Sequence, residues 1–493
     1  MRNHVLKAII RVFPVLVFLA MAISGGCASS PRPKEPLPSS PAPKATEPAT
    51  PHPSQSSPSP SSSSSPPLTL AECIKIALAQ NPLNRAAQEG VTAAREKVGE
   101  ATAPYYPEIG LNAGYSRWQK YAFLPSGISR PGMSKVIGPT DDWTAGLKAR
   151  LLLFDSGERK ARLTAALAGQ WALEEDAERA RQDIIMQVHQ AYYGLRSAQE
   201  ARSVAGKNLA RAEDHLRLAT ERKEAGAAPK VDVIRAQGEV AQARLTVVKT
   251  ENLVRIAKGK LNIAMGSPVE TRLQITDQPE VINPPDNINI YDALDQATRT
   301  RPALKAALFR VAAARREIRA ARSTFGPKIR AEGGYGWRGP DRFPDDEEWL
   351  AGITLDWPIF TGFSSMHLLS RTRARALQEE AEAERLALEV QDEVWSAYSK
   401  LQETYEAIQT AQALIQTAQE GLRLARERYE AGSGSMSDLL DTQTTLAQAE
   451  ASHLEAQWDY LLARASFQRA IGQLGQQAGA AGISHEESSR ENP

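Results

Sequence analysis

Apolar and polar side chains alternate along several stretches of about ten residues, a spacing that predicts half-exposed β-strands. The stretches are residues 108–116, 143–151 and 349–357, and a fourth surrounds Tyr335. Alternation over this length is typical of transmembrane strands, weakly for one segment and more strongly for four. It also fits the edge of a soluble β-sandwich. Four tryptophans stand toward the loop ends of the strands, where an aromatic girdle is expected: Trp118, Trp143, Trp337 and Trp349.

A seven-residue period marks two longer segments, residues 156–223 and 364–429, and neither contains proline. At 1.5 Å per residue, each predicts a helix of roughly 100 Å. A strict heptad period gives left-handed supercoiling, and small residues let neighbouring helices approach closely. Helices this long cannot form a globular core, so they need neighbours on more than one side. The small residues of the period are Ala191, Ala198, Ala205, Ala212 and Ala219, and then Ala397, Thr404, Ala411, Ala418 and Ala425.

The chain contains two copies of this pattern of strands and helices. Residues 224–226 and 430–432 carry the same Glu-Ala-Gly sequence 206 positions apart, whereas Pro82 and Pro302 are 220 apart. The difference of 14 residues predicts a longer, exposed loop between residues 115 and 143 of the first copy.

We therefore predict a first repeat at residues 68–266, a linker at 267–289 and a second repeat at 290–472. Each repeat begins with an Ala-rich helix, predicted at 70–102 and at 290–323.

The strands are too few to cross a membrane alone. No apolar run after residue 27 reaches the ~18 residues that a membrane helix needs. Open strand edges cannot lie in lipid, and the smallest closed barrels have eight strands. If the strands are embedded in a membrane, several protomers must pool them.

The N-terminus has the features of an export signal at residues 1–26: basic residues, then an uncharged apolar stretch. The small residues before Cys27 resemble a bacterial lipoprotein signal, in which Cys27 becomes the acylated first residue. Ser24 departs from the usual aliphatic residue of such signals, and ordinary cleavage with Cys27 incidental is the alternative. The following residues, 27–67, are rich in Pro and Ser and predict an extended, lipidated tether. Residues 473–493 are predicted to be a disordered tail.

Charge and chemistry exclude several classes of function. The chain has 59 basic and 58 acidic residues without a basic patch for nucleic acid. Seven scattered histidines show no metal-ligand spacing. A phosphate-binding loop, a catalytic triad and a disulfide framework are absent from the sequence, since Cys73 is the one cysteine besides Cys27. We expect no enzyme activity, no cofactor and no metal.

Residues 68–472 resemble the TolC family of outer-membrane efflux proteins, most specifically in two turn motifs at 225–237 and 431–443. The resemblance implies an α+β membrane protein: a trimeric TolC-like duct whose 12-stranded transmembrane β-barrel, four strands per protomer, continues into a long α-helical coiled-coil barrel. It implies a homotrimer in outer-membrane lipid, with a helical tunnel in the periplasm. The expected partners are a periplasmic adaptor protein and an inner-membrane pump. Acylation and tether resemble the lipoprotein branch of the family.

The resemblance also implies roles for residues near the turns. Asp438 and Asp441 match the acidic constriction of the tunnel, although the start of a solvated helix also favours acidic residues. Asp232 and Tyr429 match a pair that holds the entrance shut, although Tyr429 also continues a heptad track. Gly434 stands where some members have an arginine that adds a closing contact. The hairpin tips, which contact the adaptor, contain Gly226 and Gly432.

The function predicted from these features is that of a passive exit duct for small molecules in a tripartite efflux system. A type I protein secretion duct and a periplasmic coiled-coil protein without a pore are the alternatives. The sequence does not identify the exported substrate. Because the second copy alone has both Asp441 and Tyr429, we predict that it carries the gate.

Overall fold

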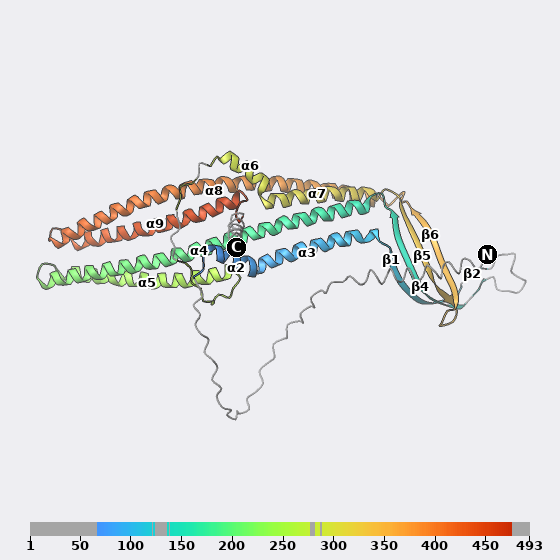
Figure 1. Ribbon diagram of the computed structural model, residues 1–493, viewed down its shortest axis with the longest axis horizontal. Helices are drawn as coiled ribbons and strands as arrows, with labels where there is room; N and C mark the ends of the chain where they lie inside the picture. Colours follow the sequence, from blue (N-terminus) through green and yellow to red (C-terminus); the bar gives the residue numbers. More distant parts are fainter. Residues whose placement is uncertain are drawn as a thin grey trace, which may run out of the picture. The chain divides into compact units, whose positions relative to one another are not determined.

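The computed structural model describes residues 67–120, 139–276, 282–285 and 288–475, together with the backbone at 122–123 and 136–137. The predicted signal peptide, the tether with Cys27 and most of the predicted tail, from residue 476 on, lie outside the described residues. The first residues of the tail predicted at 473–493 are folded, since Leu474 is 3% exposed and packs in the hydrophobic core. Within the described residues, long helices extend side by side from one four-stranded sheet (Figure 1).

The sheet is antiparallel, with the strand order β1-β4-β5-β6. Its strands are β1 (Glu108–Trp118), β4 (Thr140–Phe154), β5 (Lys328–Gly339) and β6 (Asp346–Asp356). The predicted extra loop of the first copy contains a small hairpin of β2 (Ala122–Phe123) and β3 (Val136–Ile137).

The two faces of the sheet differ in polarity, as the alternation predicts. Tyr115 pairs with Trp143, and Tyr335 pairs with both Leu147 and Trp349, so these side chains share one face. Charged and small residues share the opposite face. On the apolar face Leu111 is 79% exposed, which is unusual for a soluble sheet and fits a surface that contacts lipid.

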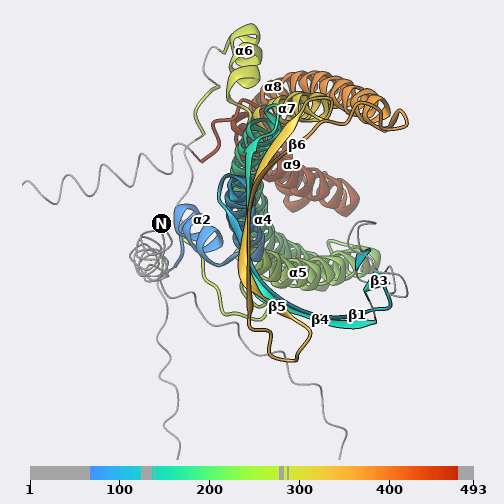
Figure 2. The same ribbon diagram turned by 90° about the vertical axis from the view of Figure 1, so that its right-hand side faces the viewer.

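Each copy contributes a pair of long helices that forms an antiparallel hairpin. The first pair is α4 (Glu158–Glu224) and α5 (Lys230–Ala264), and the second is α8 (Ser364–Glu430) and α9 (Met436–Ala470). Shorter helices, α3 (Pro82–Thr102) and α7 (Pro302–Ser323), pack against α4 and α8 near the sheet. In Figure 2 the helices α8, α7, α4 and α5 follow an open arc.

The Ala-rich helix predicted at the start of each copy is in fact two helices, and the expectation of one continuous helix is wrong. In the first copy α2 (Leu70–Gln80) ends before α3, and in the second α6 (Ile290–Thr300) ends before α7. Asn81 and Arg301 separate them with extended ψ angles of 124° and 118°. Each precedes a proline, whose ring disfavours helical backbone in the preceding residue. A short 3-10 helix, η2 (Ala103–Tyr105), connects α3 to the sheet.

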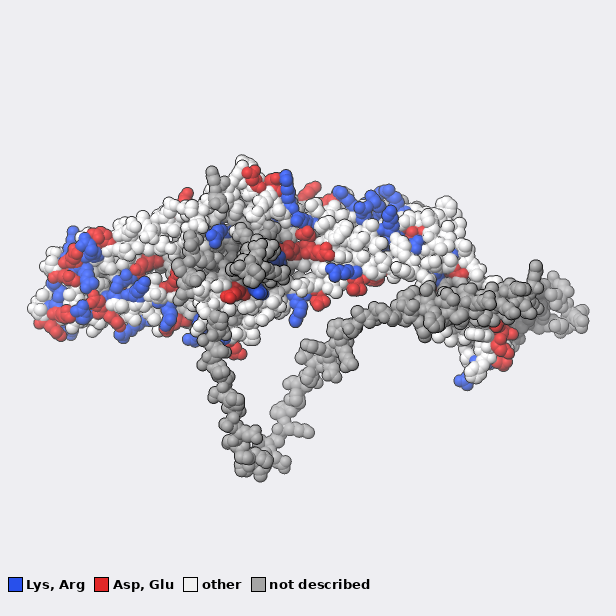
Figure 3. Space-filling view, viewed as in Figure 1, with Lys and Arg blue, Asp and Glu red and all other residues white. Residues whose placement is uncertain are grey.

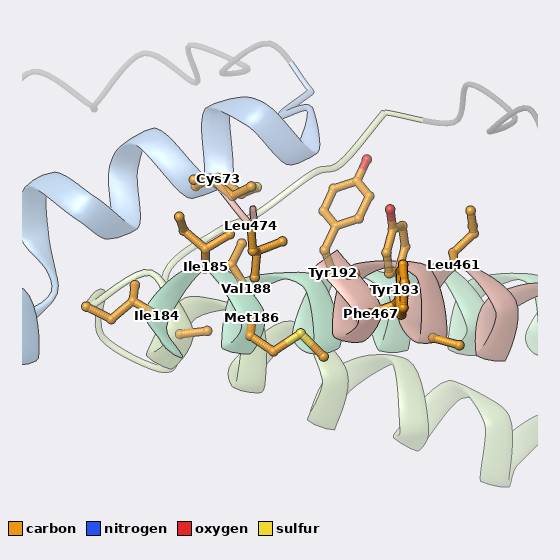
Figure 4. Packing of buried hydrophobic residues seen from close by; sticks show 14 of the residues in the cluster. Cys73, Ile184, Ile185, Met186, Val188, Tyr192, Tyr193, Leu461, Phe467 and Leu474 are labelled. Atoms are coloured by element: carbon orange, nitrogen blue, oxygen red, sulfur yellow. The ribbon is translucent and has the colours of Figure 1, made fainter. Parts of the chain in front are cut away.

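The largest hydrophobic core lies midway along the long helices, where α2 and α9 pack on α4 (Figure 4). Ile184, Val188 and Leu195 of α4 are fully or almost fully buried there, and Cys73 of α2 joins them. Toward the tips the packing depends on small residues. The predicted heptad track is buried at Ala205, Ala212 and Ala219, and at Thr404, Ala411 and Ala418.

Candidate periplasmic gate

The two hairpin tips have the same turn geometry. Gly226 and Gly432 follow the ends of α4 and α8 with φ angles of +74° and +77°, which favour glycine. Ala227 N donates to Arg222 O at 2.8 Å and closes the end of α4. The glycines therefore shape the tips. Their contact with an adaptor stays a prediction.

Tyr429 joins the second hairpin to the first. It comes from the end of α8, yet it is only 3% exposed and packs in one cluster with Ala219 of α4 and Ala236 of α5. Its hydroxyl donates to Asp232 Oδ2 of α5 at 3.3 Å. Burial raises the pKa of Tyr429, and the nearby Asp232 carboxylate raises it further. The hydroxyl is thus protonated at neutral pH and available as a donor.

Arg222 adds a contact that the sequence did not predict. Its guanidinium lies over the Tyr429 ring, 5.1 Å from the centroid, and donates to the backbone carbonyl of Glu430. A cation over an aromatic face is attracted by the ring quadrupole. Since Arg222 belongs to α4 and Asp232 to α5, both helices of the first hairpin contact Tyr429. No motif around Arg222 distinguishes it from other arginines of the coiled coil.

The two aspartates near the start of α9 have different surroundings. Asp438 forms a capping box with Ser435: the Asp438 amide donates to Ser435 Oγ at 3.1 Å, and the Ser435 amide donates to Asp438 Oδ2 at 3.4 Å. Asp438 and Asp441 are both exposed and one helical turn apart, on the side away from buried Leu439. The helix-start interpretation therefore accounts for part of the role of Asp438.

Gly434 lies in the second turn, and its lack of a side chain matters sterically. A Cβ atom there would approach Arg428 Cβ to 3.0 Å and Tyr429 N to 3.1 Å. The turn as folded leaves little room for an arginine side chain at this position.

Farther from the tips, ion pairs connect the two copies of the repeat. Arg211 of α4 pairs with Glu450 of α9 at 2.6 Å, and Arg426 of α8 pairs with Asp214 of α4 at 2.9 Å. The Arg217 side chain donates to Asp214 and holds the pKa of that carboxyl below its usual range. These residues were not predicted as part of the gate, because contacts between copies leave no local sequence pattern.

His215 lies between these ion pairs, on α4, and is 2% exposed. Burial lowers the pKa of its imidazole below the ordinary 6.5, because the desolvated ring disfavours charge. A neutral histidine therefore lies in the seam between the hairpins at neutral pH.

The described part of the chain contains no cluster of three His, Cys, Asp or Glu side chains suited to hold a metal ion. A search of its helices for a stretch long and apolar enough to cross a membrane finds none.

Comparison with known proteins identifies the family of this chain. The sequence family described as "Outer membrane efflux protein" matches residues 73–267 and 293–473. The chain belongs to this family. Among relatives of this efflux protein, Protein CyaE of Bordetella pertussis is 30% identical over 395 residues, covering 78% of this chain and 80% of that one. The pyoverdine export outer membrane protein OpmQ of Pseudomonas aeruginosa is 24% identical over 421 residues, covering 80% and 84%.

A solved structure supports the same fold. The outer-membrane channel OprN superposes on this efflux protein with a TM-score of 0.73 and 21% identity, over 82% of this chain and 90% of that one. The resemblance to the TolC family and the TolC-like fold are confirmed. The protein is an outer-membrane channel of efflux systems, without enzyme activity, whose helices form the periplasmic part.

Proposed function

We propose that the protein is the trimeric, passive exit duct of a tripartite system that exports small molecules through an adaptor and an inner-membrane pump. The observation that carries this proposal is the open sheet. Among the described residues, β1 and β6 each have one unpaired edge, and one face of the sheet is apolar. An open edge is unsatisfied in lipid, so closure has to come from other copies. Three protomers give twelve strands, enough for a barrel.

The gate belongs to the same proposal. Two hairpins per protomer converge at the tips, and the contact of Tyr429 with Asp232 and Arg222 holds them together in the closed state. Around a threefold axis, Asp438 and Asp441 supply six carboxylates, which favour cations at the constriction. The tips around Gly226 and Gly432 are the surface offered to the adaptor.

Export of small molecules is favoured over protein secretion by one relative whose name states its cargo. OpmQ exports pyoverdine, a small molecule, and covers most of this chain. Coupling to a pump belongs to the proposal, because a passive duct supplies no energy of its own and the driving force has to come from an inner-membrane pump. Co-purification of an adaptor and a proton-driven pump supports the proposal, and co-purification of an ABC transporter with a secreted protein favours a type I duct.

Reconstitution in a planar bilayer tests the pore. We expect purified trimers to conduct, and trimers with Asp438→Ala and Asp441→Ala to conduct with altered selectivity. Trimers that do not conduct, with or without the substitutions, overturn the pore and favour a structural coiled-coil protein.

We also propose that Cys27 is acylated and anchors the tether to the outer membrane. The small residues before it and the Pro/Ser-rich segment after it support this. Mass spectrometry of the mature N-terminus is expected to show the added lipid. A Cys27→Ser protein with unchanged processing and membrane association, and a wild type without lipid mass, overturn the anchor.

A further inference from the structure

An apolar belt lies where the strands meet the helices. Between β6 and α8, Ile359 is 93% exposed and Phe360 is 74% exposed, and Phe360 stacks edge-to-face with exposed Phe363. The equivalent segment of the first copy exposes Leu153 and Phe154. Exposed aromatic and aliphatic side chains at strand ends are typical of the level of lipid headgroups. Both copies therefore have exposed apolar side chains at the level expected for the periplasmic boundary of the proposed barrel.

Directly beyond this belt the second copy is strongly basic. Residues 311–325 and 364–378 contain seven arginines and one acidic residue, Glu317. We call the exposed arginines of this region that form no ion pair within the described residues the basic collar. Its members are Arg319 and Arg322 of α7 and Arg371, Arg373 and Arg375 of α8.

The first copy shows whether the fold shared by the two repeats requires these arginines. Helices α3 and α4 begin 220 and 206 residues before α7 and α8, so the repeats can be compared position by position. At the positions of the collar the first copy has small or apolar residues: Gly99, Thr102, Ala165, Leu167 and Gly169. The shared fold does not need arginines there, so another interaction must explain them.

The arginines of the collar have no acidic partner in the described part of the protomer. Nearby Arg315 pairs with Glu380 at 2.7 Å, whereas the structure gives no ion pair to any arginine of the collar among the described residues. In Figure 3, Lys and Arg side chains gather over α7 and α8 toward the sheet. This view is from the side of α2 and α6, which Figure 2 places on the convex side of the arc. The charge therefore faces outward, away from the hollow of the arc.

The collar also lies close enough to the sheet to reach the phosphate groups of lipids around the proposed barrel. Arg319 and Arg322 stand in the last turns of α7, next to the sheet, and Arg371 is seven residues after the start of α8, or roughly 10 Å at the helical rise. Arginine side chains from these positions reach back to the phosphates below the apolar belt. Guanidinium groups bind phosphate oxygens in a fork geometry that is well suited to such contacts.

We propose that the basic collar binds the phosphate groups of anionic phospholipids in the periplasmic leaflet of the outer membrane. This inference rests on the proposed function, because it requires the sheet to be embedded as part of a trimeric barrel. The collar and the apolar belt together fix the depth of the channel in the membrane. Clusters of basic residues at a membrane surface gain affinity from each added charge.

The test uses the full-length trimer and one substituted version, Arg319→Gln, Arg322→Gln, Arg371→Gln and Arg375→Gln. Native mass spectrometry measures bound lipid during titration with phosphatidylglycerol or phosphatidylethanolamine. We expect the wild type to prefer phosphatidylglycerol, and the substituted trimer to lose roughly fivefold in that preference for each arginine removed. A matched control changes four exposed arginines far from the sheet to Gln: Arg85, Arg235, Arg255 and Arg272.

Each outcome decides the proposal. Equal binding of phosphatidylglycerol by wild type and collar variant overturns it. Competition by millimolar inorganic phosphate indicates a free-phosphate site and also overturns it. A collar variant that falls apart into monomers while the control stays trimeric assigns the arginines to contacts between protomers, for which the exposed acidic residues Glu96 and Glu100 of α3 are suitable. Conductance of the same preparations separates the two proposals, since a conducting trimer without lipid preference overturns the collar alone.

Discussion

The Tyr429 hydroxyl donates to Asp232 Oδ2 at 3.3 Å, and the two residues come from different copies of the repeat. Tyr429 is 3% exposed and Asp232 is 8% exposed, so water competes little for this hydrogen bond. Arg222 covers the tyrosine ring and links its own helix to the backbone beside Tyr429. One side chain of the second hairpin is thus held between two helices of the first. Separation of the hairpins has to break both contacts.

Removal of the hydroxyl is expected to favour the open channel. Tyr429→Phe keeps the ring, its packing and the contact with Arg222, and removes only the hydrogen bond to Asp232. A hydrogen bond to a charged group contributes about 1.5–3 kcal/mol, and the long oxygen–oxygen distance of 3.3 Å reduces this. With about 1 kcal/mol lost, the ratio of open to closed channels rises roughly fivefold. Single-channel recording measures the open probability.

The control for this variant is Tyr291→Phe, which removes a hydroxyl from an exposed tyrosine of α6. It is expected to leave the open probability unchanged. If Tyr429→Phe also leaves it unchanged, the residue packs the tip without acting as a latch.

Neutralisation of the aspartates near the tip is expected to reduce selectivity for cations. Asp438→Asn and Asp441→Asn together remove six charges from a trimer while keeping side-chain size, and the amide oxygen of Asn at position 438 still accepts from the Ser435 amide. The reversal potential in a potassium chloride gradient should shift toward that of an unselective pore. Asp459→Asn, exposed on α9 and 18 residues further from the tip, is the control. A reversal potential that stays at the wild-type value places the constriction elsewhere.

Acidification is expected to weaken the closed state through His215. In the closed seam burial lowers the pKa of this histidine, whereas in separated hairpins the ring is solvated and has its ordinary pKa of 6.5. Above pH 6.5 both states are neutral and the closed state is unaffected. As the pH falls below 6.5, the separated state takes up a proton that the closed state does not, so closure loses free energy. The charged groups that act on the ring are Arg211 and Asp214 on α4 and Arg426 on α8, and Arg211 is itself paired with Glu450 on α9.

The measurement is the open probability between pH 7.5 and pH 5. We expect a rise on acidification in the wild type and a smaller rise in His215→Gln. His367→Gln, at an exposed position near the sheet, should keep the wild-type profile. An unchanged pH profile in His215→Gln assigns the dependence to other groups.

The sequence predicted the features that depend on local periodicity. The alternation around Trp143 and Trp349 gave the strands and their two faces, and the heptad alanines gave the buried track at Ala212 and Ala219. The break before Pro302 was missed, although the rule for residues that precede proline was available.

Of the tertiary contacts in the gate, one was predicted from the sequence and the others were not. Asp232 and Tyr429 were paired through a family resemblance and do lie in contact, while their role as a latch stays a prediction. Arg222 and the ion pair of Arg211 with Glu450 were not predicted, since they join positions on helices that only the folded chain brings together. The duplication gave no signal for them, because the contacts differ between the copies.

A close approach of two strands in the middle of the sheet leads to the last prediction. Gly146 of β4 lies opposite Gly336 of β5, and a Cβ atom added to Gly336 would come within 2.6 Å of Gly146 Cα. Because backbone atoms cannot move aside as a flexible side chain can, Gly336→Ala should force the strands apart and disturb the sheet curvature that a closed barrel needs. Gly352→Ala in β6, where the added Cβ meets no atom within 4 Å, is the matched control. We expect folded trimer in outer-membrane fractions, measured as the heat-modifiable band on gels, to fall severalfold for Gly336→Ala and to stay at the wild-type level for Gly352→Ala. Wild-type amounts of trimer for both variants would show that the sheet adjusts to the added methyl group and that the glycine pair is not required for assembly.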